Sequence, residues 1–231
     1  MNLGPITPYP MPTERDLPET YVPWIPDPAR AVLLIHDMQR YFLRPYTADA
    51  SPARDLLHNC GLLRTRCAQL GVPVAYTAQP GDMTDEERGL LKDVWGPGMH
   101  ADEEDRRIVD SLAPRTDDIV FTKWRYSALH RTGLLETLRE AGRDQLIICG
   151  VYAHVGCLMT AVDAFSHDIQ TFLVADAIAD FSLDGHRTAL SYAADNCAAV
   201  PTTRGLLLDL AAADRAVSPS SQATEVTGQY T

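Results

Sequence analysis

Paired cysteines are missing from this sequence. Its five cysteines are an odd number and none belongs to a CxxC pair, so neither a disulfide framework nor a zinc ribbon is expected. The first residues show no basic segment followed by an apolar core, and no apolar run approaches the roughly 18 residues that a membrane span requires. We therefore expect a cytoplasmic protein.

Positive charge is scarce as well. The chain has 231 residues, and 20 Lys and Arg stand against 31 Asp and Glu, which gives a formal net charge of −11. Because an acidic protein repels polyphosphate and anionic lipid, we expect neither nucleic acid nor a membrane as a partner. The phosphate-binding patterns GxGxxG and GxxxxGKS/T are also absent. Net charge does not identify a substrate, because an acidic chain can still enclose a cationic pocket for a small anion.

The histidines lack the spacing of metal ligands. None of the seven forms a pair such as i, i+4, and residues 77–99 contain no histidine. We therefore expect no metal, no other cofactor, and structural roles for the histidines. His36 is the exception, because it stands beside Asp37 and could support that carboxylate.

Apolar segments alternate with helical patterns through residues 31–215. This alternation predicts βαβ units with right-handed crossovers, and therefore an α/β fold around a parallel sheet. Residues 79–98 are rich in glycine and too long for a simple connection, so we expect a functional loop there. The predicted strands are residues 31–36, 72–77, 119–122, 145–149, 171–175 and 198–202. The predicted helices are residues 55–70, 102–112, 132–141, 154–167, 184–196 and 203–213.

The two ends of the chain differ from this central domain of residues 31–215. Residues 1–30 hold eight of the sixteen prolines, so they can form neither a regular helix nor a central strand. They also contain Tyr9, Tyr21 and Trp24, which makes them too apolar for a free tail, and we expect an arm packed on the domain. Residues 216–231 are rich in Ser and Thr, and their composition predicts a flexible tail.

Polar groups follow the ends of several predicted strands. Asp37 ends the apolar run AVLLIH, and ligands in open parallel sheets bind beyond the carboxyl ends of the strands. The same Asp could instead cap a helix. Lys123 follows another strand, where it is either a surface residue or a buried cation that needs an anion. Gly150 and Gly156 flank a turn from strand to helix, which suits an anion site or plain packing.

Six motifs in colinear order resemble the isochorismatase family, within the cysteine-hydrolase-like superfamily that includes nicotinamidases. The resemblance implies a three-layer, Rossmann-like fold with a six-stranded parallel sheet of order 3-2-1-4-5-6, and a homodimer. Within the family, the sequence resembles the phenazine-pathway enzymes that hydrolyse 2-amino-2-deoxyisochorismate. The motifs are AVLLIHDMQRYF, YTAQP, LLKDVWGPGM, TKWRYSALH, GVYAHVGC and VADAIADFS.

The superfamily has an Asp–Lys–Cys triad, and this chain departs from it. The resemblance matches Asp37 with the acid and Lys123 with the lysine, but it places Gly156 where the nucleophilic cysteine belongs. Cys157 lies one position further on, about 100° around the helix. The isochorismatase branch commonly has glycine here, so we expect no covalent thiol chemistry.

The resemblance therefore implies that Asp37 is the general acid. It would protonate the vinyl carbon of an enol-pyruvyl ether, and the ether would then hydrolyse to pyruvate and a ring alcohol. Lys123 would contact the substrate and Asp37, while Gln79 and Arg88 would hold the substrate carboxylates. Tyr152 and the Gly156 N–H would contact the pyruvyl group, next to a cis peptide at residues 151–152. Ordinary core packing is an equally good interpretation of the expected pocket walls, Phe42, Trp95 and Tyr126.

Three other functions compete with this one. Isochorismate differs from the amino substrate only by OH in place of NH₂, and its hydrolysis would give 2,3-dihydro-2,3-dihydroxybenzoate for a siderophore. Siderophore-pathway relatives often carry an appended carrier domain, for which this chain ends too early, so we expect the amino substrate. A non-catalytic relative of the fold would not need Asp37 and Lys123. A nicotinamidase-type amidase is disfavoured by Gly156 and by the absent metal ligands.

Overall fold

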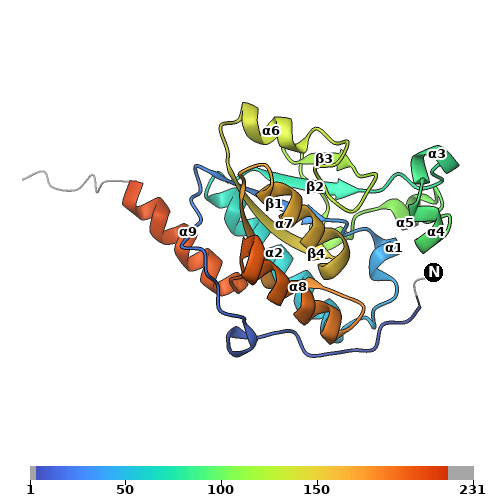
Figure 1. Ribbon diagram of the computed structural model, residues 1–231, viewed down its shortest axis with the longest axis horizontal. Helices are drawn as coiled ribbons and strands as arrows, with labels where there is room; N and C mark the ends of the chain where they lie inside the picture. Colours follow the sequence, from blue (N-terminus) through green and yellow to red (C-terminus); the bar gives the residue numbers. More distant parts are fainter. Residues whose placement is uncertain (1–3, 218–231) are drawn as a thin grey trace, which may run out of the picture.

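One parallel sheet organises the chain in the computed structural model, which describes residues 4–217 (Figure 1). Its strands are β1 (Ala31–His36), β2 (Val74–Ala78), β3 (Ile119–Thr122), β4 (Gln145–Val151), β5 (Gln170–Ala179) and β6 (Ala198–Ala199). They lie in the order β3-β2-β1-β4-β5-β6, and every pair of neighbours is parallel. The predicted α/β fold and its strand order are confirmed.

Helices cover both faces of the sheet (Figure 1). One cluster of buried residues lies between two helices and the sheet face that carries Leu33 and Ile35. A second cluster lies between three other helices and the opposite sheet face, which carries Leu34. Successive residues of a strand point to opposite faces, so burial of both faces explains why β1 is uniformly apolar. The first face packs against α2 (Ala53–Gln69) and α9 (Thr203–Val217), and the second against α6 (Leu134–Glu140), α7 (Leu158–Phe165) and α8 (Leu183–Asn196).

The remaining helices are short, and most gather at the carboxyl end of the sheet. Strand β1 lies between β2 and β4. Strands β2 and β3 are therefore added on one side of β1, and strands β4 to β6 on its other side. Such a reversal opens a crevice beyond the strand ends. Figure 1 shows α1, α3, α4 and α5 at this end of the sheet. These elements are α1 (Arg40–Leu43), α3 (Asp85–Arg88), α4 (Leu91–Trp95) and α5 (Glu103–Arg106), and the 3-10 turns are η1 (Glu14–Asp16) and η2 (Asp110–Leu112).

The predicted helix over residues 102–112 is wrong. Only α5 and η2 form there, and the backbone between them pairs with the segment that follows β1. The Arg40 N–H donates to the Arg107 carbonyl at 2.9 Å, and the Val109 N–H donates to the Met38 carbonyl at 3.0 Å. A backbone group committed to a distant segment cannot close a helical turn, so tertiary pairing overrides the local pattern.

Residues 79–98 are also more regular than a plain loop, since α3 and α4 lie within them. Thr84 begins α3 with a capping box, in which its hydroxyl accepts the Glu87 N–H and the Glu87 carboxylate accepts the Thr84 N–H. This Thr-x-x-Glu pattern is a helix-start signal that sequence inspection can find. Most of the predicted tail, residues 218–231, lies outside the described residues.

The N-terminal arm reaches the core through Ile6 and Tyr9, which are both buried in the cluster beneath α2 and α9. The Tyr9 hydroxyl accepts the Asp180 N–H at 2.8 Å and lies 3.2 Å from His186 Nδ1. These bonds join residues that are more than 170 positions apart in the chain. No helix within residues 4–217 is long and apolar enough to cross a membrane.

Tyr9→Phe is expected to lower the free energy of unfolding by about 1–3 kcal/mol, because it leaves the buried Asp180 N–H without an acceptor. Urea unfolding followed by circular dichroism would measure the change. Tyr46→Phe is the matched control, because the buried Tyr46 hydroxyl has no hydrogen-bond partner among the described residues. It should leave stability unchanged or raise it. Equal effects of the two substitutions would contradict anchoring of the arm by Tyr9.

Candidate active site

A pocket opens at the carboxyl end of the sheet, and the space within it and its open mouth amounts to about 620 Å³. All nine residues predicted for the site line it, together with others that the sequence did not single out, among them Tyr41, Arg125 and Phe181. The nine are Asp37, Phe42, Gln79, Arg88, Trp95, Lys123, Tyr126, Tyr152 and Gly156.

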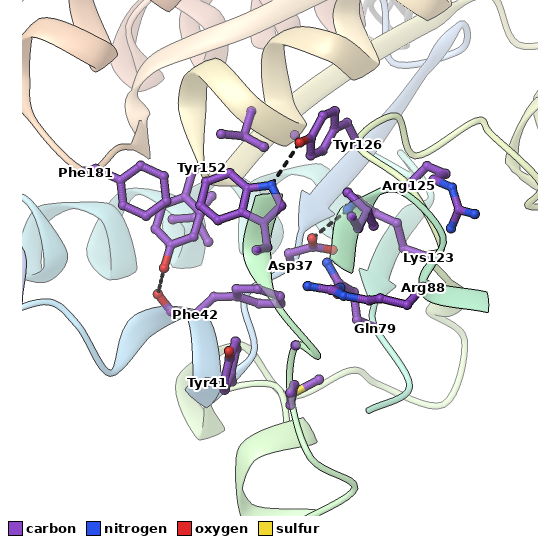
Figure 2. Close-up of a pocket in the computed structure, with 17 residues that line it drawn as sticks. Asp37, Tyr41, Phe42, Gln79, Arg88, Lys123, Arg125, Tyr126, Tyr152 and Phe181 are labelled. Carbon is purple, nitrogen blue, oxygen red and sulfur yellow. Dashed lines mark hydrogen bonds and ion pairs between the residues drawn. The ribbon is translucent and has the colours of Figure 1, made fainter. Parts of the chain in front are cut away.

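Asp37 and Lys123 form a buried ion pair within this pocket (Figure 2). Lys123 Nζ lies 2.8 Å from Asp37 Oδ2, and the two side chains are only 3% and 6% exposed. The Thr77 hydroxyl donates to the other carboxylate oxygen at 2.7 Å. Asp37 ends β1 with a φ of 50°, a left-handed conformation that few residues other than Gly, Asn and Asp adopt. Asp37 is therefore not a simple helix cap.

The environment of Asp37 favours its ionised form. Burial raises the pKa of the Asp37 carboxyl, but the charge of Lys123 and the hydrogen bonds from Lys123 and Thr77 outweigh burial, so that this pKa lies below its ordinary value. A general acid needs the proton. In the unliganded protein Asp37 is therefore a carboxylate held by Lys123, and acid catalysis requires that a ligand change this balance.

Arg88 is a buried cation without a carboxylate partner in residues 4–217. Its guanidinium donates through Nε to the Gly96 carbonyl at 3.0 Å and lies 3.5 Å from Gln79 Oε1. Gly98 has a φ of +89°, and a Cβ atom there would lie 2.8 Å from the Arg88 guanidinium carbon, so glycine lets the side chain fit. Burial lowers the pKa of Arg88, which is the sign of a desolvated cation that an anionic ligand would stabilise.

Arg125 holds the segment that carries Arg88. Its Nη1 donates to the Glu87 carbonyl at 2.6 Å and to the Trp124 carbonyl at 2.7 Å. A Cβ atom on Gly89, where φ is +50°, would approach Arg125 Nη2 to 2.9 Å. Figure 2 shows its guanidinium turned away from Asp37. Arg125 therefore fixes the end of α3 and adds positive charge at the rim of the pocket.

Gln39, which the sequence did not mark as a candidate, fixes the backbone of Gln79. The buried Gln39 side chain accepts the Gln79 N–H at 2.8 Å and donates to the carbonyls of Gln79 and Arg106 at 3.0 and 2.8 Å. It thus joins the ends of β1 and β2 to α5. A polar residue after a strand usually lies on the surface, so the sequence alone gave no reason to expect this contact.

Aromatic side chains form one wall of the pocket. The Tyr152 ring stacks on Phe181 with 4.0 Å between centroids, and Trp95 stacks on Phe181 at 5.8 Å. The Tyr152 hydroxyl donates to the Phe42 carbonyl at 2.6 Å, and Trp95 Nε1 donates to the Tyr126 hydroxyl at 2.8 Å (Figure 2). The polar tips of the rings are thereby satisfied, so the wall is rigid and largely apolar.

The turn after β4 contains the cis peptide bond at Val151–Tyr152 and the π-helical turn η3 (Ala153–Cys157). The Gly156 N–H is not free here, because it donates to the Tyr152 carbonyl at 3.0 Å, as the Val155 and Cys157 N–H groups also do at 3.2 Å. The expected amide contact from Gly156 to a ligand therefore has a competing partner. What Gly156 does provide is space, since it lines the pocket without a side chain.

No thiol faces the pocket among its lining residues. Cys157 is fully buried in the core cluster of α6, α7 and α8, and burial raises the pKa of its thiol well above the ordinary value. Within the described residues, no group of three or more His, Cys, Asp or Glu side chains is arranged to hold a metal ion. The ionic groups of the lining are instead Arg88, Lys123 and Arg125 against Asp37, so a strongly acidic chain encloses a cationic pocket.

Comparisons with known proteins identify the family and the fold. Residues 31–205 match the model of the isochorismatase domain. The phenazine biosynthesis protein PhzD1 of Pseudomonas aeruginosa is 59% identical over 202 residues, which are 87% of this chain and 97% of that protein. The isochorismatase of Bacillus subtilis is 53% identical, over 97% of this chain and 72% of that protein. A cysteine hydrolase structure from Pseudomonas syringae has the same fold, with a TM-score of 0.76, 23% identity, and coverage of 85% and 98% of the two chains.

The fold and the pocket define an α/β enzyme with its site at the switch point of the sheet. The chain belongs to the isochorismatase family and is a hydrolase of the isochorismatase type.

Proposed function

We propose that this enzyme hydrolyses the enol-pyruvyl ether of 2-amino-2-deoxyisochorismate to trans-2,3-dihydro-3-hydroxyanthranilate and pyruvate, in the biosynthesis of a secondary metabolite. The observation that carries the proposal is the buried Asp37–Lys123 pair in a cationic pocket whose lining contains no thiol. A substrate with two carboxylates complements Arg88 and Lys123 in charge. A vinyl ether needs a proton donor for its cleavage and no nucleophilic side chain.

In this proposal Asp37 transfers its proton to the terminal carbon of the vinyl group, and the electron pair of the double bond forms the new C–H bond. The adjacent carbon becomes an oxocarbenium ion, which the Asp37 carboxylate stabilises electrostatically. Water adds to that carbon and loses a proton, and the hemiketal breaks into pyruvate and the ring alcohol. The aromatic wall of Tyr152, Trp95 and Phe181 limits the access of further water.

Substrate binding would cause the Asp37 carboxylate to take up the missing proton from solvent. Lys123 keeps Asp37 ionised at 2.8 Å in the unliganded protein. A substrate carboxylate within reach of Lys123 would share its positive charge and would add negative charge near Asp37. Both changes raise the pKa of the Asp37 carboxyl, so a proton is taken up as the substrate binds.

Isochorismate is the second candidate substrate, and the 53% identity to an isochorismatase supports it. The amino substrate is preferred because identity is higher, at 59%, to a phenazine biosynthesis protein. The test is to supply each compound to the purified enzyme and to follow pyruvate with lactate dehydrogenase and NADH. We expect a higher kcat/KM with the amino substrate. A higher kcat/KM with isochorismate would support the second candidate, and no pyruvate from either compound would refute both.

A further inference from the structure

The side chain of His36 fills the space next to Gly156. A Cβ atom built on Gly156 would lie 2.3 Å from His36 Cε1 and 3.1 Å from each ring nitrogen. Real Cβ atoms essentially never approach another heavy atom to less than 3.0 Å. His36 is completely buried and is not among the residues that line the pocket. The ring therefore stands directly behind the pocket wall that Gly156 forms.

A hydrogen bond on one side and a packing contact on the other hold this ring. Nδ1 lies 2.9 Å from the Val151 carbonyl oxygen, which can only accept, so Nδ1 carries the hydrogen and donates. The Thr160 hydroxyl donates its hydrogen to the Gly156 carbonyl at 2.8 Å and accepts the Ala128 N–H at 2.9 Å. Its oxygen packs 3.3 Å from His36 Nε2, which carries no hydrogen in this tautomer. The imidazole thus joins β4, the turn η3, helix α7 and the segment that follows Lys123.

We propose that His36 is a positioning residue of the site: its neutral imidazole takes the space that a side chain at residue 156 would need and holds the turn after β4 beside Asp37. His36 Nδ1 is 3.8 Å from Asp37 Oδ2, so the same ring borders both the acid and the turn that carries Tyr152. The inference deepens the proposed hydrolysis and rests on it for its kinetic readouts. It also explains why this site has no room for a thiol nucleophile at residue 156.

Neutrality of the ring serves the acid. Burial lowers the pKa of His36 to about 4, against a smaller opposing effect of Asp37. A protonated ring would place a second cation beside the Asp37 carboxylate and would make its protonation harder. The charged groups that act on His36 are Asp37 and Lys123, and they oppose each other.

The first test compares His36→Asn with His36→Leu, two side chains of nearly equal shape. Asn keeps an N–H donor near the position of Nδ1, whereas Leu removes it. We expect kcat to fall less than about tenfold in the Asn variant and about a hundredfold in the Leu variant, with KM nearly unchanged in both, because His36 positions the site without touching the pocket. Equal kcat values in the two variants, or a change that is confined to KM, would overturn the proposal.

The second test is a double-mutant cycle between residues 36 and 156. Gly156→Ala alone should lower the Tm strongly, but in the His36→Asn background it should cost much less, because Cε1 and Nε2 are then absent. Gly61→Ala is the control, since a Cβ atom at this position in α2 meets nothing within 4 Å. Additive effects on the Tm would overturn the steric part of the inference.

Wild-type protein provides a test that needs no variant to fold. In long-range ¹⁵N–¹H spectra of histidine-labelled enzyme, the ring of His36 should appear as a neutral Nδ1–H tautomer that persists from pH 8 to pH 5. An Nε2–H tautomer of His36, or titration of His36 near pH 6.5, would contradict the assignment. If the wild-type enzyme released no pyruvate from either substrate, the proposed function would fail. The Tm coupling between residues 36 and 156 and the tautomer of His36 could still be measured.

Discussion

Asp37→Asn is expected to lower kcat by about a thousandfold or more, in a protein that still folds but has a lower Tm. General acid catalysis contributes about 10²–10⁴ in rate, and the asparagine also removes the negative charge that stabilises the oxocarbenium ion. Thr77 can still donate to the amide oxygen, so the local geometry has an anchor. The measurement is the rate of pyruvate release at saturating substrate, together with the Tm.

The buried position of Asp37 makes a second variant necessary. Removal of one member of a buried ion pair costs about 3–5 kcal/mol of stability, because Lys123 is left without its anion. The double variant Asp37→Asn, Lys123→Met removes both charges and should recover much of the Tm without recovering turnover. Asp209→Asn, at an exposed position on α9, should leave both properties unchanged. A kcat within tenfold of wild type in Asp37→Asn would refute the general-acid role.

The sheet and the position of Asp37 at its edge could be predicted because both follow from one simple pattern. A strand buried on both faces is uniformly apolar, and the residue that ends it lies at the ligand-binding edge of a parallel sheet. Asp37 and Lys123 are therefore visible in the sequence. Their pairing was expected only from the family resemblance, because β2 separates β1 from β3 and the register of three strands brings the two side chains within 2.8 Å.

Residues that depend on tertiary contacts escaped prediction. Phe181 follows β5, and its place beside Tyr152 depends on the register shift between β4 and β5 near Gly150. In the sequence Gln39 resembles a surface residue, because its partners, the backbone carbonyls of Gln79 and Arg106, come close only in the folded chain. The failed helix at residues 102–112 has the same cause, since its backbone bonds to the segment after β1.

The homodimer, the cytoplasmic location and the domain bounds remain predictions.

Arg88→Ala is expected to raise KM for the dianionic substrate by about 10- to 100-fold, because a buried charge-assisted hydrogen bond contributes about 1.5–3 kcal/mol. Stability should change little or increase, since the guanidinium is desolvated without a carboxylate partner in residues 4–217. Arg88→Lys keeps the charge but loses the planar guanidinium, so its KM should lie between the KM of wild type and the KM of Arg88→Ala.

The controls for Arg88 separate binding from catalysis. Steady-state kinetics should show that Arg88→Ala changes KM much more than kcat, because carboxylate binding stabilises the bound substrate and the transition state equally. Pyruvate, as a competitive inhibitor, should also bind more weakly to Arg88→Ala if this residue holds the pyruvyl carboxylate, and equally well if it holds the ring carboxylate. Arg139→Ala, at an exposed position on α6, should leave KM unchanged. An unchanged KM in Arg88→Ala would mean that the buried cation shapes the loop between β2 and α5 instead of binding the substrate.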